Sequence, residues 1–159
     1  MRAVVAGLLL AAAAAIAQGK FADLTASDQV RLNKQRAVVL SELARRYGAQ
    51  RLTGAPSDLP LLQRLVDDNV FGKTQTWELQ ALGVAFGDVL ANDLGMRWVV
   101  VTDEYGTDPT LRYRDTSIQV NALTMISNRI EDGKPVDLED IRQGVRREID
   151  RILKSGDYK

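Results

Sequence analysis

The chain has 159 residues, no cysteine, no histidine and a formal net charge of zero. Without histidine it lacks the usual general base, the usual zinc ligand and every nucleophile scheme built on imidazole, and without cysteine the fold must hold by packing alone. The balanced charge argues against a nucleic-acid binder, and any bound metal would need oxygen ligands.

The N-terminal stretch MRAVVAGLLLAAAAAIAQGK is typical of a secretory signal peptide. Arg2 supplies the positive start, an apolar run extends to Ile16, and Ala15-Ile16-Ala17 is a small-x-small cleavage motif. The run is shorter than the ~20 residues that span a bilayer, which disfavours an uncleaved membrane anchor. We therefore expect a signal peptide at 1–17, cleaved after Ala17, and one domain at 18–159. That domain would be periplasmic or secreted and would not associate with a membrane.

Three helices are predicted in the first part of the mature chain. The first covers 25–47, with Thr25 and Asp28 at capping-box spacing and Gly48 as its stop. A short helix follows at 60–69, and a long apolar one at about 75–94. Gly83 and Gly87 lie four residues apart in the long helix, and this spacing predicts close approach by another element.

Three short strands and two helices are predicted after Gly95. The strands cover 96–102, 111–114 and 117–120, and a three-stranded antiparallel meander is the simplest arrangement for them. Helices are expected at 122–131 and 137–155, the second with a regular apolar stripe and a salt-bridged solvent face. The order predicts an α+β fold in which a small antiparallel three-stranded sheet packs with about five helices.

Asp103, Glu104 and Asp108 crowd the DEYGTD stretch, which allows three interpretations. A turn at Gly106, with the acids meeting Arg112 or Arg114 across a hairpin, is favoured because Asp and Gly are ordinary turn residues. A calcium loop is disfavoured because the run does not match the EF-hand pattern. A catalytic carboxylate pair would need a partner from elsewhere, such as Asp88, because neighbouring strand residues point to opposite sides.

Asp88 interrupts the apolar helix predicted at 75–94. An exposed or edge position is the favoured interpretation. The alternative is a buried acid that is satisfied by an arginine, for which Arg129 is the best candidate. Basic residues also concentrate between Asp28 and Arg51, and acids between 58 and 108. Such segregation is more typical of solvated or mutually packed faces than of a basic docking surface.

The segment 76–140 resembles the bacterial family filed as domain of unknown function 3806. The resemblance rests on the stretch from Gly83 to Asp88, on Trp98, on the DEYG turn, and on the 125–129 helix with Gly133. It implies a small bacterial domain without an established activity.

These observations predict a non-catalytic binding domain of the bacterial envelope, with an envelope protein as its partner. An immunity-type inhibitor of a periplasmic toxin is one concrete form. The alternative is a carboxylate-dependent hydrolase acting on envelope glycan or peptide. The sequence contains no phosphate loop, GxSxG, dinucleotide-binding or zinc motif, which disfavours an enzyme. No catalytic residue, cofactor or metal ligand is assigned. The candidate binding residues are Asp88, Asp103, Glu104, Tyr105, Asp108 and Arg129.

Overall fold

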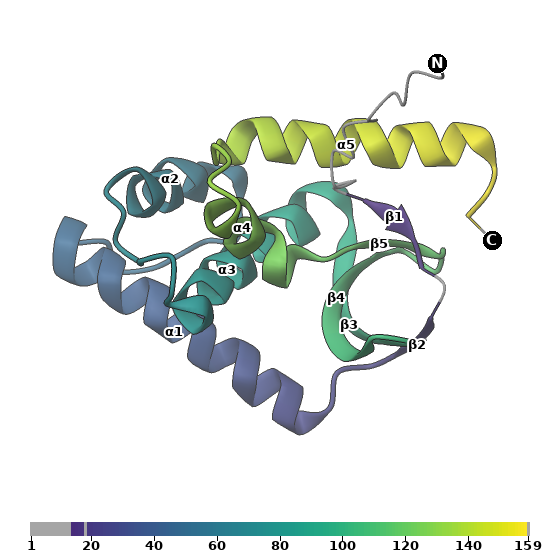
Figure 1. Ribbon diagram of the computed structural model, residues 1–159, viewed down its shortest axis with the longest axis horizontal. Coiled ribbons are helices and arrows are strands. Elements are labelled where there is room, and N and C mark those ends of the chain that lie inside the picture. The colour runs from purple at the N-terminus through teal and green to yellow at the C-terminus, as the bar shows by residue number, and fades with distance from the viewer. Residues whose placement is uncertain (1–13, 18, 159) are drawn as a thin grey trace, which may run out of the picture.

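The computed structural model describes residues 14–17 and 19–158. Most of its helices gather on one side of the molecule, a curved sheet lies on the other, and the C-terminal helix runs along both (Figure 1). The helices of the described residues are α1 (Ala26–Tyr47), a 3₁₀ turn η1 (Pro56–Asp58), α2 (Leu59–Asp67), α3 (Thr76–Leu94), α4 (Ala122–Glu131) and α5 (Leu138–Ser155). The strands are β1 (Ala15–Ile16), β2 (Lys20–Ala22), β3 (Met96–Asp103), β4 (Gly106–Tyr113) and β5 (Ile118–Val120). The α+β class predicted from the sequence is confirmed.

The sheet has five strands in the order β1-β5-β4-β3-β2, with every neighbouring pair antiparallel. The prediction of a three-stranded sheet was therefore wrong. The predicted meander is present as β3, β4 and β5, but β2 pairs with β3 at one edge and β1 pairs with β5 at the other. The two added strands have only two and three residues, too few for a period-2 pattern to appear in the sequence. In addition, β1 lies within the predicted signal peptide.

Strand β4 begins at Gly106, five residues earlier than predicted. Its first residues, GTDP, are polar and contain a proline, so they look like a loop in the sequence. Pro109 lies opposite Val100 of β3, whereas β5 pairs with β4 only at Leu111 and Arg112. Pro109 thus occupies a part of β4 that has one strand neighbour, where its missing N–H breaks no second ladder.

The five predicted helices are all present, with bounds close to those expected. The capping box of α1 forms, because the Thr25 side chain accepts from the Asp28 N–H and the Asp28 side chain accepts from the Thr25 N–H. Gly48 ends the helix in the left-handed conformation at φ 70°. The predicted stripe of α5 is buried throughout and comprises Leu138, Ile141, Val145, Ile149 and Ile152.

Helix α3 is the centre of the fold and contacts α1, α2, α4, α5 and strands β3 and β4. Figure 1 shows it between α1, α4 and the sheet. Its glycines permit this crowding: a Cβ on Gly83 would lie 2.5 Å from the carbonyl oxygens of Ala122 and Leu123. At Gly87 a Cβ would lie 2.5 Å from the Trp98 ring. The close approach predicted from the glycine spacing is confirmed.

Candidate functional site

The DEYG stretch forms the tip of the β3–β4 hairpin. Asp103 pairs with Gly106 at the end of the ladder, and Gly106 adopts φ 136°, a conformation that side chains other than hydrogen rarely allow. The Asp103 Oδ1 accepts a hydrogen bond of 2.8 Å from the Tyr105 N–H. The predicted turn at Gly106 is therefore confirmed, although the arginine contacts predicted for its acids are not formed. Tyr105 is 89% exposed, the most exposed large apolar side chain among the described residues.

The hairpin acids do not meet the arginines that were predicted for them. Arg112 donates from Nε to the Thr116 carbonyl at 2.6 Å, and its guanidinium lies over the Phe21 ring. The Arg114 guanidinium lies over Tyr113. The register explains this outcome, because Arg112 faces Arg97, far along the ladder from the hairpin tip.

Asp88 is held by two elements at once. Its carboxylate accepts from Arg36 of α1 in a bidentate pair, with Nε–Oδ2 at 2.7 Å and Nη2–Oδ1 at 2.8 Å, and from Trp98 Nε1 at 2.9 Å. The hydrogen bond to Asp88 raises the pKa of Arg36 above its ordinary value. The predicted partner, Arg129, was wrong. It lies on α4, whereas the arginine that reaches Asp88 comes from a helix more than 50 residues earlier in the chain.

A groove with a volume of about 730 Å³ opens beside this ion pair. Its walls are α1, the 51–54 loop, α3 and the start of β3. The lining residues are Asn33, Arg36, Ala37, Leu40, Arg51, Leu52, Thr53, Gly54, Asp58, Ala85, Asp88, Ala91, Asn92, Arg97 and Trp98. A concave surface of this size, with apolar lining and a few fixed polar groups, is the usual form of a ligand site.

The 51–54 loop is held in place by Asp58, which is 5% exposed. Its carboxylate accepts from the backbone N–H groups of Thr53 and Gly54 and from the Thr53 hydroxyl, at 2.7 to 3.1 Å. Asn92 of α3 donates to the Gly54 carbonyl at 2.9 Å and joins this loop to the opposite wall. The groove is therefore bordered by a fixed loop on this side.

Among the predicted site residues, only Asp88 lines the groove. Asp103, Glu104, Tyr105 and Asp108 lie at the hairpin tip. Asp103 follows Trp98 by five residues along β3, which corresponds to roughly 16 Å. The facing carboxylates that a hydrolase of the predicted kind would need are thus not formed by Asp88 and the hairpin acids. Arg129 is half-buried on α4 and outside the groove lining.

Sequence reasoning missed the arginines of the groove. Arg36 and Arg51 belong to the basic run between Asp28 and Arg51. The expectation that this run packs against the acidic segment 58–108 is met at Arg36, which pairs with Asp88, but it gives no indication that the two arginines line a groove. The position of Arg36, four residues after the buried Leu32, places it at the border of the apolar stripe of α1. That signal could have identified Arg36 as a residue at a helix–helix seam, although it could not have named its partner.

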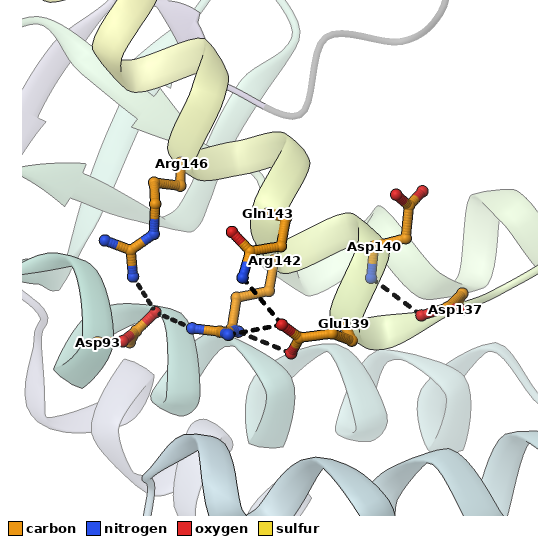
Figure 2. Close-up of polar contacts among 7 residues, drawn as sticks. All are labelled: Asp93, Asp137, Glu139, Asp140, Arg142, Gln143 and Arg146. Carbon is orange, nitrogen blue, oxygen red and sulfur yellow. Dashed lines mark hydrogen bonds and ion pairs between the residues drawn. The ribbon is translucent and has the colours of Figure 1, made fainter.

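A second polar cluster joins α3 to α5 (Figure 2). Asp93 Oδ2 accepts from Arg142 Nη1 at 2.6 Å and from Arg146 Nη2 at 2.8 Å. Arg142 also pairs with Glu139, and the hydrogen bonds that Glu139 accepts from Arg142 and Gln143 lower the pKa of its carboxyl to about 2. Every charged group in this cluster has a partner, so the cluster fixes the docking of α5.

Within residues 14–17 and 19–158, no three or more histidine, cysteine, aspartate or glutamate side chains come together in a way that could hold a metal ion. In the same part of the chain, no helix combines the length and apolar character needed to cross a bilayer.

An α+β fold with a half-apolar groove and a fixed ion pair is the class of molecule that the geometry defines. Residues 58–141 match the family described as domain of unknown function (DUF3806). The matched residues make up more than half of the chain. The chain therefore belongs to this family, and the match begins before the segment 76–140 on which the resemblance was based.

The fold is also similar to that of a crystal structure from Bacteroides thetaiotaomicron VPI-5482, with a TM-score of 0.71 and 19% sequence identity. The similarity covers 79% of this chain and 46% of that protein, so this chain spans about half of its length. No curated protein matches the chain. The likeness at this identity concerns the fold alone.

Proposed function

We propose that the protein is a non-catalytic binding domain of the bacterial envelope and that the groove beside Asp88 is its binding site. The signal-peptide pattern at 1–17 supports export to the periplasm or beyond. The observation that carries the proposal is the groove itself, a preformed concavity between α1 and α3 with an apolar floor.

The charge pattern of the groove favours binding over catalysis. General acid–base catalysis needs a carboxyl within hydrogen-bond reach of the reacting group. Asp88 instead directs its oxygens to groups of the protein itself, because it accepts two hydrogen bonds from the Arg36 guanidinium and one from the Trp98 indole. Asp58 accepts backbone and hydroxyl donors in the same way. These acids serve to hold the walls of the groove.

Site-specific photocrosslinking tests this proposal. Ala37 is exposed and lines the groove, whereas Asp150 is exposed on α5, away from the groove lining. A photoreactive phenylalanine analogue at each position, in protein exported in cells, should give a discrete adduct with one envelope protein from position 37 and none from position 150. The absence of an adduct at position 37, or equal adducts at the two positions, would contradict the proposal.

The partner identified by this adduct then allows a quantitative check. Ala37→Arg places a bulky side chain in the groove without removing a buried contact, because Ala37 is exposed. We expect this change to weaken binding of the purified partner at least tenfold by calorimetry, and Asp150→Arg to leave it unchanged. If the partner is a toxin, as in the immunity-type form of the proposal, an equimolar amount of the protein should abolish the toxin's activity.

A further inference from the structure

We propose that the groove recognises an acidic segment of the partner protein, one that carries aspartate or glutamate beside an apolar side chain. This inference rests on the proposed binding function and specifies the chemistry of the partner. It follows from which charges in the groove already have partners and which do not.

The two acids of the groove have partners within the protein. Asp88 is occupied by Arg36 and Trp98, and Asp58 by the backbone of the 51–54 loop. Arg36 is committed as well, because its Nε and Nη2 bind Asp88 and its Nη1 donates to Asn33. The charges of Asp88 and Arg36 cancel, and the Asp58 carboxylate, which remains charged, directs its oxygens to the Thr53 and Gly54 donors of the 51–54 loop.

Two arginines at the rim remain available. Arg51 is exposed and makes no ion pair with any residue that the structure describes. Arg97 Nη1 donates to the Asp115 carboxylate and to the Arg114 carbonyl, both at 3.2 Å, while no partner for Nε or Nη2 is found among the described residues. The Asp115 carboxylate is 90% exposed. A pair of this kind is worth roughly 0–1 kcal/mol, so an incoming carboxylate can replace it. The rim of the groove therefore presents two guanidinium groups, which match carboxylates in a bidentate geometry.

The floor of the groove is apolar and limits the kind of anion that fits. Leu40, Leu52, Ala85, Ala91 and the half-buried Trp98 form it. The Trp98 Nε1 already donates to Asp88, so the floor offers this ring as an apolar surface. A polyphosphate or an acidic sugar would place polar groups against that floor, where they would lose hydration without gaining hydrogen bonds. A peptide with an acidic and an apolar side chain satisfies the rim and the floor together.

Selection of peptides from a random library tests this inference directly. Twelve-residue peptides displayed on phage are selected on protein purified after export from cells, and their sequences are compared with the unselected library. We expect enrichment of aspartate and glutamate next to leucine, isoleucine or phenylalanine. An Arg51→Glu, Arg97→Glu double variant should select basic peptides instead. Peptides without acidic enrichment, or the same peptides from the wild type and the double variant, would overturn the inference.

A selected acidic peptide then measures the contribution of the rim. Arg51→Gln combined with Arg97→Gln should raise the Kd of this peptide at least tenfold, measured by fluorescence anisotropy. Raising the salt concentration from 50 to 300 mM should likewise raise the Kd of the peptide for the wild-type protein. Arg147→Gln removes an exposed charge from α5 and is the matched control, for which we expect no change.

The crosslinked partner separates failure of this inference from failure of the proposed function. Mass spectrometry of the adduct at position 37 gives the partner segment that contacts the groove. An acidic segment supports the inference. A neutral or basic segment overturns the inference while the proposed binding function stands, whereas the absence of a partner at position 37 contradicts the proposed function.

Discussion

Asp88 joins α1, α3 and β3 through one carboxylate. Its bonds to Arg36 and to Trp98 are partly shielded, since the Arg36 and Asp88 side chains are 34% and 24% exposed. Hydrogen bonds to charged groups at such sites contribute more to stability than hydrogen bonds between neutral groups. Removal of one partner also leaves the other without its counter-charge. The residue therefore fixes the groove and stabilises the fold.

We predict that Asp88→Asn lowers the free energy of unfolding by roughly 1–3 kcal/mol, because the amide keeps the shape but loses the charge that faces Arg36. Urea unfolding of the purified protein measures this effect. Asp115→Asn, which removes a 90% exposed carboxylate beside Arg97, is the control and should change stability by less than about 0.5 kcal/mol. Equal losses in the two variants would show that the Asp88 pair is no stronger than a surface pair.

Gln35 presents the opposite situation on the buried face of α1. It is 0% exposed, and neither Nε2 nor Oε1 has a hydrogen-bond partner among the described residues. Burial of an amide without partners costs roughly 1–3 kcal/mol. We predict that Gln35→Leu stabilises the protein by about 1–2 kcal/mol, since leucine has a similar volume and a similar helix propensity.

Thermal unfolding of Gln35→Leu checks this prediction against Gln29→Leu, which is exposed on the same helix and should change little. A destabilised Gln35→Leu variant would mean that the buried amide is hydrogen-bonded to an enclosed water molecule.

At the scale of elements, the packing of α3 against α4 depends on a residue without a side chain. A methyl group at Gly83 would meet two carbonyl oxygens of α4 at 2.5 Å, so the backbone of α4 would have to move. We predict that Gly83→Ala costs roughly 1–3 kcal/mol by denaturant unfolding, despite the better helix propensity of alanine. A Cβ on Gly144 of α5 would have its nearest neighbour at 3.8 Å, so Gly144→Ala should instead raise the free energy of unfolding by up to about 1 kcal/mol. An unchanged free energy of unfolding in Gly83→Ala would mean that α4 can shift away from the added methyl group at no cost in stability.

The docking of α5 should depend on pH through Glu139. Its folded pKa of about 2 lies below the ordinary value of 4.5, so folding favours the ionised form. The contribution of this carboxylate to stability is therefore complete above pH 4.5 and is lost as the pH falls toward 2. We predict that Glu139→Gln is less stable than the wild type at pH 6 and equally stable near pH 2.

Thermal midpoints measured between pH 6 and pH 2 check the Glu139 prediction. Glu131→Gln is the matched control, because Glu131 is exposed and has no ion pair within the described part of the chain. A Glu139→Gln difference that persists unchanged to pH 2 would contradict the assignment.

How much of each element could be predicted from the sequence depended on whether its signal is local. The five helices were predictable because their caps and apolar periods lie within the segments themselves, as in the Thr25–Asp28 box and the α5 stripe. The DEYG turn was predictable for the same reason. Strands β1 and β2 were not, because they are too short to carry a pattern and exist only through pairing with β5 and β3.

The candidate site depends even more on distant contacts. The glycine spacing of α3 correctly indicated close packing, yet which element approaches is decided by the tertiary fold. The Asp88–Arg36 contact joins residues 52 positions apart, and the groove exists only after α1, α3 and the 51–54 loop have met. A single sequence offers no measure of such proximity, so Asp88 was found as an anomaly in an apolar helix while its partner was assigned incorrectly.

At the scale of the whole molecule, the proposed export and the observed sheet make one joint prediction. Cleavage after Ala17 would remove β1, which pairs through Ala15 and Ile16 with β5, together with Ala14, which is 1% exposed. The other four strands and the core around α3 lie after the cleavage position.

We therefore predict that the chain 18–159 folds cooperatively, and that it is less stable than the chain 14–159 by roughly 1–2 kcal/mol, or a few degrees in thermal midpoint. Calorimetry of the two chains measures the difference, and N-terminal sequencing of the exported protein should begin at Gln18. A chain 18–159 that fails to fold would make β1 an obligatory strand. The mature protein would then have to retain residues 14–17, and the proposed cleavage after Ala17 would be wrong.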